Sequence, residues 1–170
     1  MLAIVLAAVL GVLTWTLLEY VIHRWMGHDR RFKRTPFGVE HVRHHAQGNY
    51  FAPTWKKLVF ATLFAAAVTP AACGIAGVEA GLAYVVGLVG FYGVYEWLHR
   101  REHTHAVWGP YGRWARRHHF HHHFVDGRAN HGVTSPIWDV VFRTYQQPAA
   151  SIAVPRKLVM PWLVDATNAS

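Results

Sequence analysis

Cysteine is almost absent from this chain of 170 residues, which contains only Cys73. A single cysteine excludes a disulfide framework and any zinc site built from pairs of cysteines. Acidic residues are also few, 9 against 17 lysines and arginines, so the formal net charge is +8. A charge of that size is typical of nucleic-acid-binding proteins when it is spread over a surface. Here it is confined to parts of the chain.

Lysine and arginine are missing altogether from two long stretches, residues 1–22 and 58–98. Both stretches are apolar, and the first has about the 20 residues that a helix needs to cross a bilayer. The second is too long for one span and has the length for two, with a connection near residues 74–81. Basic loops between apolar spans are typical of membrane proteins. We therefore predict an all-α integral membrane protein with about three transmembrane helices, and no binding of nucleic acid.

Two alternatives to this topology fit the same stretches less well. A cleaved signal peptide would begin with a basic region and have a shorter apolar run than residues 1–22. Two buried helices of a soluble core would be expected to carry some lysine or arginine over residues 58–98, and there is none. Within that block Gly87, Gly90 and Gly93 recur at helical spacing, which predicts close contact with a neighbouring helix.

Histidine is present in excess, with 14 residues, all outside the two apolar stretches. Neutral imidazole is the commonest protein ligand for transition metals. Ten histidines form four groups by spacing: His23 and His28; His41, His44 and His45; His99 and His103; and His119, His122 and His123. Positions i, i+3 and i+4 share one helix face, so each triplet can bring three rings to one point. One metal cannot use ten ligands, but two can, and we predict a dimetal site.

The spacing leaves two points open. His23 and His28 are five apart, about 140° on an ideal helix, so either the helix ends near Gly27, which we favour, or the two serve different metals. His118 with His121 and His122 has the same spacing as the last triplet, and geometry alone does not choose between these registers. The remaining histidines, His105 and His131, lie outside the repeated spacings and are predicted to be surface or loop residues.

Two carboxylates stand next to the histidines. Glu19 precedes His23 by four residues and Glu96 precedes His99 by three, both at the ends of apolar spans, where an unpaired carboxylate is costly. We predict that each accepts the ring N–H of a ligand histidine and so orients it. The alternative is that they reach the interface or pair with an arginine. Three spans would place all histidines on one membrane face, which the lysine and arginine bias predicts to be cytoplasmic, with the amino terminus on the other side.

With these motifs the chain resembles the fatty acid hydroxylase superfamily of histidine-box membrane enzymes, which includes fatty acid 2-hydroxylases, sterol desaturases and carotenoid hydroxylases. The resemblance covers roughly residues 12–146. It is carried by Glu19 to Arg24 with His28, His41 to His45, Tyr95 to His99 with His103, His118 to Phe124, and Trp138 to Phe142 with Thr144. It favours the register His119, His122 and His123, and its box spacing is most similar to the fatty acid 2-hydroxylase domain.

The length of the chain predicts a single domain over residues 1–170, with a motif-bearing core at 12–146 and a tail at 147–170. We expect it in a bacterial inner membrane. The resemblance implies a non-haem oxygenase with two iron ions, which zinc can replace in purified protein, and O₂ as co-substrate. The substrate would be a lipid from the bilayer, most simply a fatty acyl chain. No haem-binding cytochrome domain accompanies these motifs, so we expect a separate electron donor such as a ferredoxin or a cytochrome.

Other functions are compatible with the same motifs. A desaturase, or a sterol- or carotenoid-type hydroxylase, would use the same scaffold and the same ligands. A non-catalytic metal-binding membrane protein or metal transporter is a more distant alternative. A transporter would place histidines and carboxylates within the spans to line a path, whereas here all histidines lie outside them.

Overall fold

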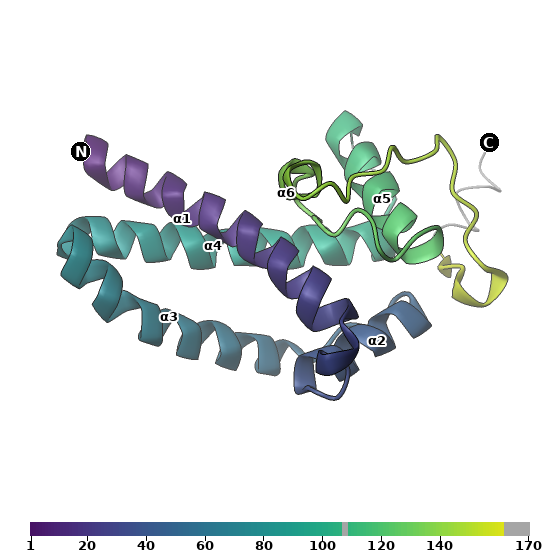
Figure 1. Cartoon of the computed structure of the whole chain (residues 1–170), viewed down its shortest axis with the longest axis horizontal. Coiled ribbons are helices and arrows are strands. Elements are labelled where there is room, and N and C mark those ends of the chain that lie inside the picture. Colours follow the sequence, from purple (N-terminus) through teal and green to yellow (C-terminus); the bar gives the residue numbers. More distant parts are fainter. Residues whose placement is uncertain (107–108, 162–170) are drawn as a thin grey trace. The chain divides into compact units, whose positions relative to one another are not determined.

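The structure is a computed structural model that describes residues 1–106 and 109–161 (Figure 1). All regular secondary structure in these residues is helical, so the predicted all-α class is confirmed. The chain divides into two compact units, one formed by residues 1–18 and 52–96 and the other by residues 19–51 with the described part of 97–170. The last nine residues of the predicted tail, 162–170, lie outside the described residues.

The first unit is built from most of three long helices, α1 (Leu2–Val21), α3 (Thr54–Ala76) and α4 (Val78–Thr104). Among the described residues, three helices are long and apolar enough to cross a membrane: Leu2–Gly27, Thr54–Ala76 and Val78–Thr104. They leave large apolar side chains exposed, such as Leu63 at 66% and Val86 at 70%. Exposed apolar surface of this extent is typical of helices that face lipid. The predicted number of candidate spans is confirmed.

Close packing in the first unit depends on glycine. A Cβ atom on Gly87 of α4 would lie 2.1 Å from the carbonyl oxygen of Ala8 on α1, so only glycine allows this approach. Figure 1 shows α1 crossing α4 at an angle. The predicted close contact is therefore confirmed at Gly87. It is wrong at Gly90 and Gly93, where an added Cβ would meet no described atom within 4 Å.

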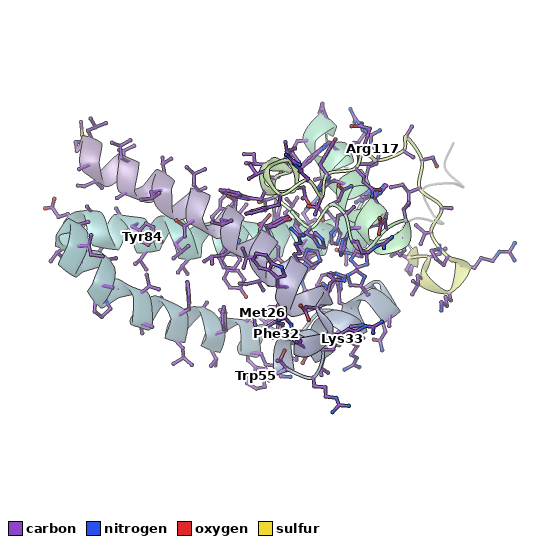
Figure 2. The ribbon with its side chains drawn as sticks, viewed as in Figure 1. Met26, Phe32, Lys33, Trp55, Tyr84 and Arg117 are labelled. Atoms are coloured by element: carbon purple, nitrogen blue, oxygen red, sulfur yellow. The ribbon has the colours of Figure 1, made fainter. Side chains whose placement is uncertain are left out.

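The second unit contains the remaining elements and the ends of α1 and α4. They are the π-helix η1 (Ile22–Gly27), the 3₁₀-helices η2 (Arg30–Phe32) and η3 (Arg156–Leu158), and the α-helices α2 (Pro36–Gln47), α5 (Gly109–Phe124) and α6 (Ile137–Val141). Its interior is unusually polar, because most of its buried side chains are histidine, glutamate or aspartate. Figure 2 shows side-chain nitrogen atoms concentrated in this unit, near α2 and α5.

Local signals fix the start and the end of α2, the first helix with a histidine triplet. The Thr35 hydroxyl accepts a hydrogen bond from the Gly38 amide at 3.1 Å, and Pro36 takes the first helical position. Both features favour a helix start. The helix ends at Gly48, whose φ of +69° lies in the left-handed region that favours glycine.

Candidate metal centre

The second unit brings ten histidines into two groups, each able to hold a metal ion. The first group is His23, His28, His41, His45 and His122, and the second group is His44, His99, His103, His119 and His123. Within each group, the candidate ligand atoms all lie within 4.8 Å of one another. The two groups are neighbours, since the rings of His45 and His123 stack at 4.0 Å between centroids. These are the ten histidines that their spacing singled out.

Each histidine triplet is divided between the two groups, whereas we expected its three rings to meet at one point. On α2, His41 and His45 belong to the first group, and His44 belongs to the second. On α5 the pattern is reversed, with His122 in the first group and His119 and His123 in the second. Residues four apart on a helix project in nearly the same direction, but the residue between them at i+3 is rotated. Each helix therefore contributes to both groups.

A π-helix explains how His23 and His28 reach the same group. Helix α1 changes at Ile22 into the π-helix η1, which ends at Gly27, where the sequence predicted the helix to end. In a π-helix, hydrogen bonds join residues five apart, so positions i and i+5 lie nearly above each other. The rings of His23 and His28 are 5.4 Å apart between centroids. The spacing of the two histidines does not predict a π-helix, because spacing is interpreted with α-helical geometry.

Gly27 allows α2 to approach this turn. A Cβ at Gly27 would lie 2.8 Å from Cδ2 and 2.9 Å from Nε2 of His41. We expect Gly27→Ala to displace the His41 ring from the first group and to lower the metal affinity of that group by at least tenfold. Metal retained per chain after dialysis against a weak chelator measures this effect. A matched change at the exposed Gly74 of α3, Gly74→Ala, meets no described atom within 4 Å and should leave retention unchanged.

Main-chain carbonyl groups determine the tautomer of three of these histidines. The Nδ1–H of His23 donates to the carbonyl of His131 at 2.6 Å, and that of His122 donates to Ala129 at 2.7 Å. In the second group, Nδ1–H of His44 donates to the Tyr50 carbonyl at 2.7 Å. With the proton on Nδ1, each Nε2 carries a lone pair directed into its group. Such outer hydrogen bonds are a general feature of metal-ligating histidines.

Burial keeps the imidazoles uncharged. Desolvation lowers the pKa of His28 to about 4 and that of His45 to about 2, with further lowering from neighbouring histidines. The pKa values of His119, His122 and His123 on α5 lie well below the ordinary value for the same reason. A neutral ring offers its lone pair without first losing a proton. The site is thus prepared to bind metal at neutral pH.

The arrangement of ring nitrogens fits a metal ion in each group. The Nε2 atoms of His28 and His122 are 2.9 Å apart, and those of His103 and His119 are 2.8 Å apart. Neighbouring nitrogens at about 2.1 Å from one ion would have similar separations. The Nε2 of His23 is buried, and the described residues offer it no hydrogen-bond partner. An ion would satisfy this lone pair, which otherwise is costly to bury.

The histidines outside the groups have other partners, which favours the register His119, His122 and His123. His118 lies 3.3 Å from the Asp139 carboxylate, and His121 lies 3.0 Å from the Gln146 amide oxygen. His105 is exposed, as predicted. His131 lies in a loop, as predicted, but it is not at the surface: it is only 2% exposed and its ring lies 5.0 Å from that of His122. Its position next to the first group could not be read from its spacing.

The two carboxylates chosen from the sequence make other contacts than those expected. Glu19 is buried and accepts hydrogen bonds from the amides of Val133 and Thr134 at 3.1 and 2.9 Å, instead of from a histidine ring. Glu96 forms an ion pair with Lys57 within the first unit. A lysine offers a carboxylate a full opposite charge, which a neutral imidazole does not. The contacts therefore correct our expectation that these carboxylates bind ring N–H groups.

Two buried carboxylates hold residues 131–134, the segment that includes the His131 carbonyl to which His23 donates. Asp139 accepts hydrogen bonds from the amides of His131 and Gly132, both at 2.8 Å. Glu19 binds the next two amides, so four consecutive N–H groups, residues 131–134, are fixed by carboxylates. The sequence analysis assigned no role to Asp139. A lone acid in the apolar run 137–142 was an available signal, because a buried carboxylate requires hydrogen-bond donors.

Comparison with known proteins agrees with this site. The family model described as "Fatty acid hydroxylase" matches residues 8–144. Dihydroceramide fatty acyl 2-hydroxylase FAH2 of Arabidopsis thaliana is 30% identical over 151 residues, which cover 79% of this chain and 58% of that protein. Fatty acid 2-hydroxylase of Rattus norvegicus is 31% identical over 149 residues, which cover 80% of this chain and 38% of that protein. The matched part thus spans between about two fifths and three fifths of the length of these relatives.

A solved structure shares the fold. It is full-length scs7p, in which only the hydroxylase domain is visible, and it matches with a TM-score of 0.63 and 24% identity. The match covers 88% of this chain and 60% of that one. The family match over most of the chain, with the histidine groups and the candidate spans, shows that this chain belongs to the fatty acid hydroxylase family of membrane lipid hydroxylases and is a distant homologue of fatty acid 2-hydroxylases.

Proposed function

We propose that this chain is a membrane-bound, non-haem di-iron oxygenase that hydroxylates a C–H bond of a lipid, with a fatty acyl chain as the substrate. The observation that carries the proposal is the pair of adjacent five-histidine groups, to which α2 and α5 both contribute. The relatives named as fatty acid and dihydroceramide fatty acyl 2-hydroxylases support the substrate class. A transporter is disfavoured, because the groups are concentrated in one unit.

In this proposal, each group holds one iron through neutral imidazole nitrogens. The chemistry that two such irons supply is the reductive activation of O₂ for the oxidation of an unactivated C–H bond. The overall reaction inserts one oxygen atom into the lipid and releases the other as water, with two electrons and two protons consumed. The chain's own residues keep the rings uncharged by burial, and the carbonyls of Ala129, His131 and Tyr50 hold their orientation.

The proposal includes the cellular setting. Residues 1–170 act as a single domain in a bacterial inner membrane, with the histidines on the cytoplasmic face and the amino terminus on the opposite side. All lysines and arginines lie outside residues 1–22 and 58–98, in the same segments as the histidines, and this bias supports a cytoplasmic position for those segments. Electrons come from a separate ferredoxin or cytochrome, and exposed Arg30, Arg31, Lys33 and Arg34 offer an acidic donor a complementary surface. A tag at the amino terminus tests this orientation. We expect the tag to be accessible only from the outer face of the membrane.

Metal analysis followed by product analysis tests the function. Protein purified in mild detergent should contain two metals per folded chain, iron and zinc counted together. The iron-loaded protein, given acyl lipids, O₂ and a reductant, should yield a product that has gained one oxygen atom. Loss of two hydrogens would instead show a desaturase on the same scaffold. One metal or none in folded protein would overturn the dimetal proposal.

A further inference from the structure

Glu102 is a buried carboxylate to which neither the sequence analysis nor the proposed function assigns a role. It lies on α4 between His99 and His103, two members of the second group. Its side chain is fully buried, and the described residues provide neither carboxylate oxygen with a hydrogen-bond partner. A carboxylate in this condition is costly, so a role that offsets the cost is expected.

The nearest unsatisfied donor belongs to a histidine of the second group. Nδ1 of His119, on α5, lies 4.0 Å from Oε2 of Glu102, and both side chains are at most 1% exposed. This Nδ1 is also buried without a hydrogen-bond partner among the described residues. Nε2 of His119 faces the second group, 2.8 Å from Nε2 of His103. If Nε2 gives its lone pair to a metal, the ring proton must be on Nδ1 and needs an acceptor.

The other histidines show what acceptor such a ring uses. His23, His44 and His122 each donate Nδ1–H to a main-chain carbonyl at 2.6–2.7 Å. Among the described residues, no carbonyl accepts a hydrogen bond from Nδ1 of His119, and the facing group is the Glu102 carboxylate. A carboxylate is a stronger acceptor than a carbonyl and increases the basicity of the ring. The separation of 4.0 Å is about 1 Å longer than a hydrogen bond.

We propose that Glu102 is a positioning residue of the second metal site, which accepts the Nδ1–H of His119 and holds that ring toward the metal. Arg116 interacts electrostatically with the carboxylate, and its Nε–H donates to the main-chain carbonyl of Glu102 at 2.9 Å. Arg116 thus gives the buried carboxylate an electrostatic partner besides the histidine. The inference rests on the two-metal part of the proposed function.

Release of Co²⁺ from the full-length protein in detergent tests the inference. The parent protein is loaded with Co²⁺, the visible absorption is recorded, and a chelator is added. We expect Glu102→Gln, which keeps one acceptor oxygen, to release one of its two ions about tenfold faster, and Glu102→Leu to release that ion about 100-fold faster. The other ion should leave at the parental rate. Glu79→Gln, an exposed carboxylate in the first turn of the same helix, is the matched control.

The leucine variant separates positioning from a purely structural role. An apolar side chain in place of a buried carboxylate is often neutral or stabilising for the fold, so a structural role predicts parental release from Glu102→Leu. That result, or equal acceleration for both ions, would overturn the inference. In a His123→Ala background, which should lack the ion of the second group, Glu102→Gln should have no effect on release. A parent protein that binds fewer than two ions would instead refute the proposed function.

Discussion

Replacing His122 or His123 by alanine should remove one metal per chain in each case, but a different one. The two residues are adjacent on α5, yet His122 belongs to the first group and His123 to the second. Lipid hydroxylation should fall by more than about 100-fold in either variant, because even the loss of an outer hydrogen bond to a ligand costs 10–100-fold. Metal analysis by mass spectrometry and product yield measure the two effects.

Double variants reveal which residues share a metal. His23→Ala combined with His122→Ala should still hold one ion, because both residues belong to the first group. His122→Ala combined with His123→Ala should hold none. Metal losses that do not add within a group, but do add between groups, indicate two separate sites. The control is His121→Ala, since that ring contacts Gln146 and belongs to neither group. A double variant in the first group that lost both ions would contradict the assignment.

Asp139→Ala should produce a large loss of stability, although Asp139 is not among the candidate ligands. It leaves the amides of His131 and Gly132 and the hydroxyl of Thr144 without the acceptor that binds them at 2.7–2.8 Å. Each buried donor left unsatisfied costs about 1–3 kcal/mol, so we expect a loss of about 4 kcal/mol in the free energy of unfolding. The first group should also retain metal less well, because the His131 carbonyl orients His23.

Thermal unfolding in detergent and metal retention test this prediction together. Asp126→Ala is the matched control, because that carboxylate is partly exposed and binds Arg128 and Gln146 near the surface. It should lower stability by less than about 1 kcal/mol, as surface changes usually do. Loss of the ion of the second group, with that of the first retained, would contradict the role assigned to Asp139.

The sequence by itself determined the features that depend on chain-local patterns. The exclusion of lysine and arginine from residues 1–22 and 58–98 predicted the three candidate spans, because a bilayer imposes length and polarity on each span separately. Repeated spacing selected the ten histidines of the two groups, since a dense set of imidazoles serves little purpose in packing. The family resemblance also followed from the order of these motifs, and the family match confirms it.

Only the tertiary structure decided how these residues are divided and supported. Spacing gives the direction of a side chain on its own helix, but the partner across the site depends on how helices pack, so each triplet was divided unexpectedly between the groups. The π-helix at Ile22–Gly27 arises from a shift of the hydrogen bonds to residues five apart, which composition does not encode. Carboxylate partners are set by long-range contacts, such as that between Glu19 and Thr134, 115 residues apart. A buried charge takes whichever donors the fold brings to it.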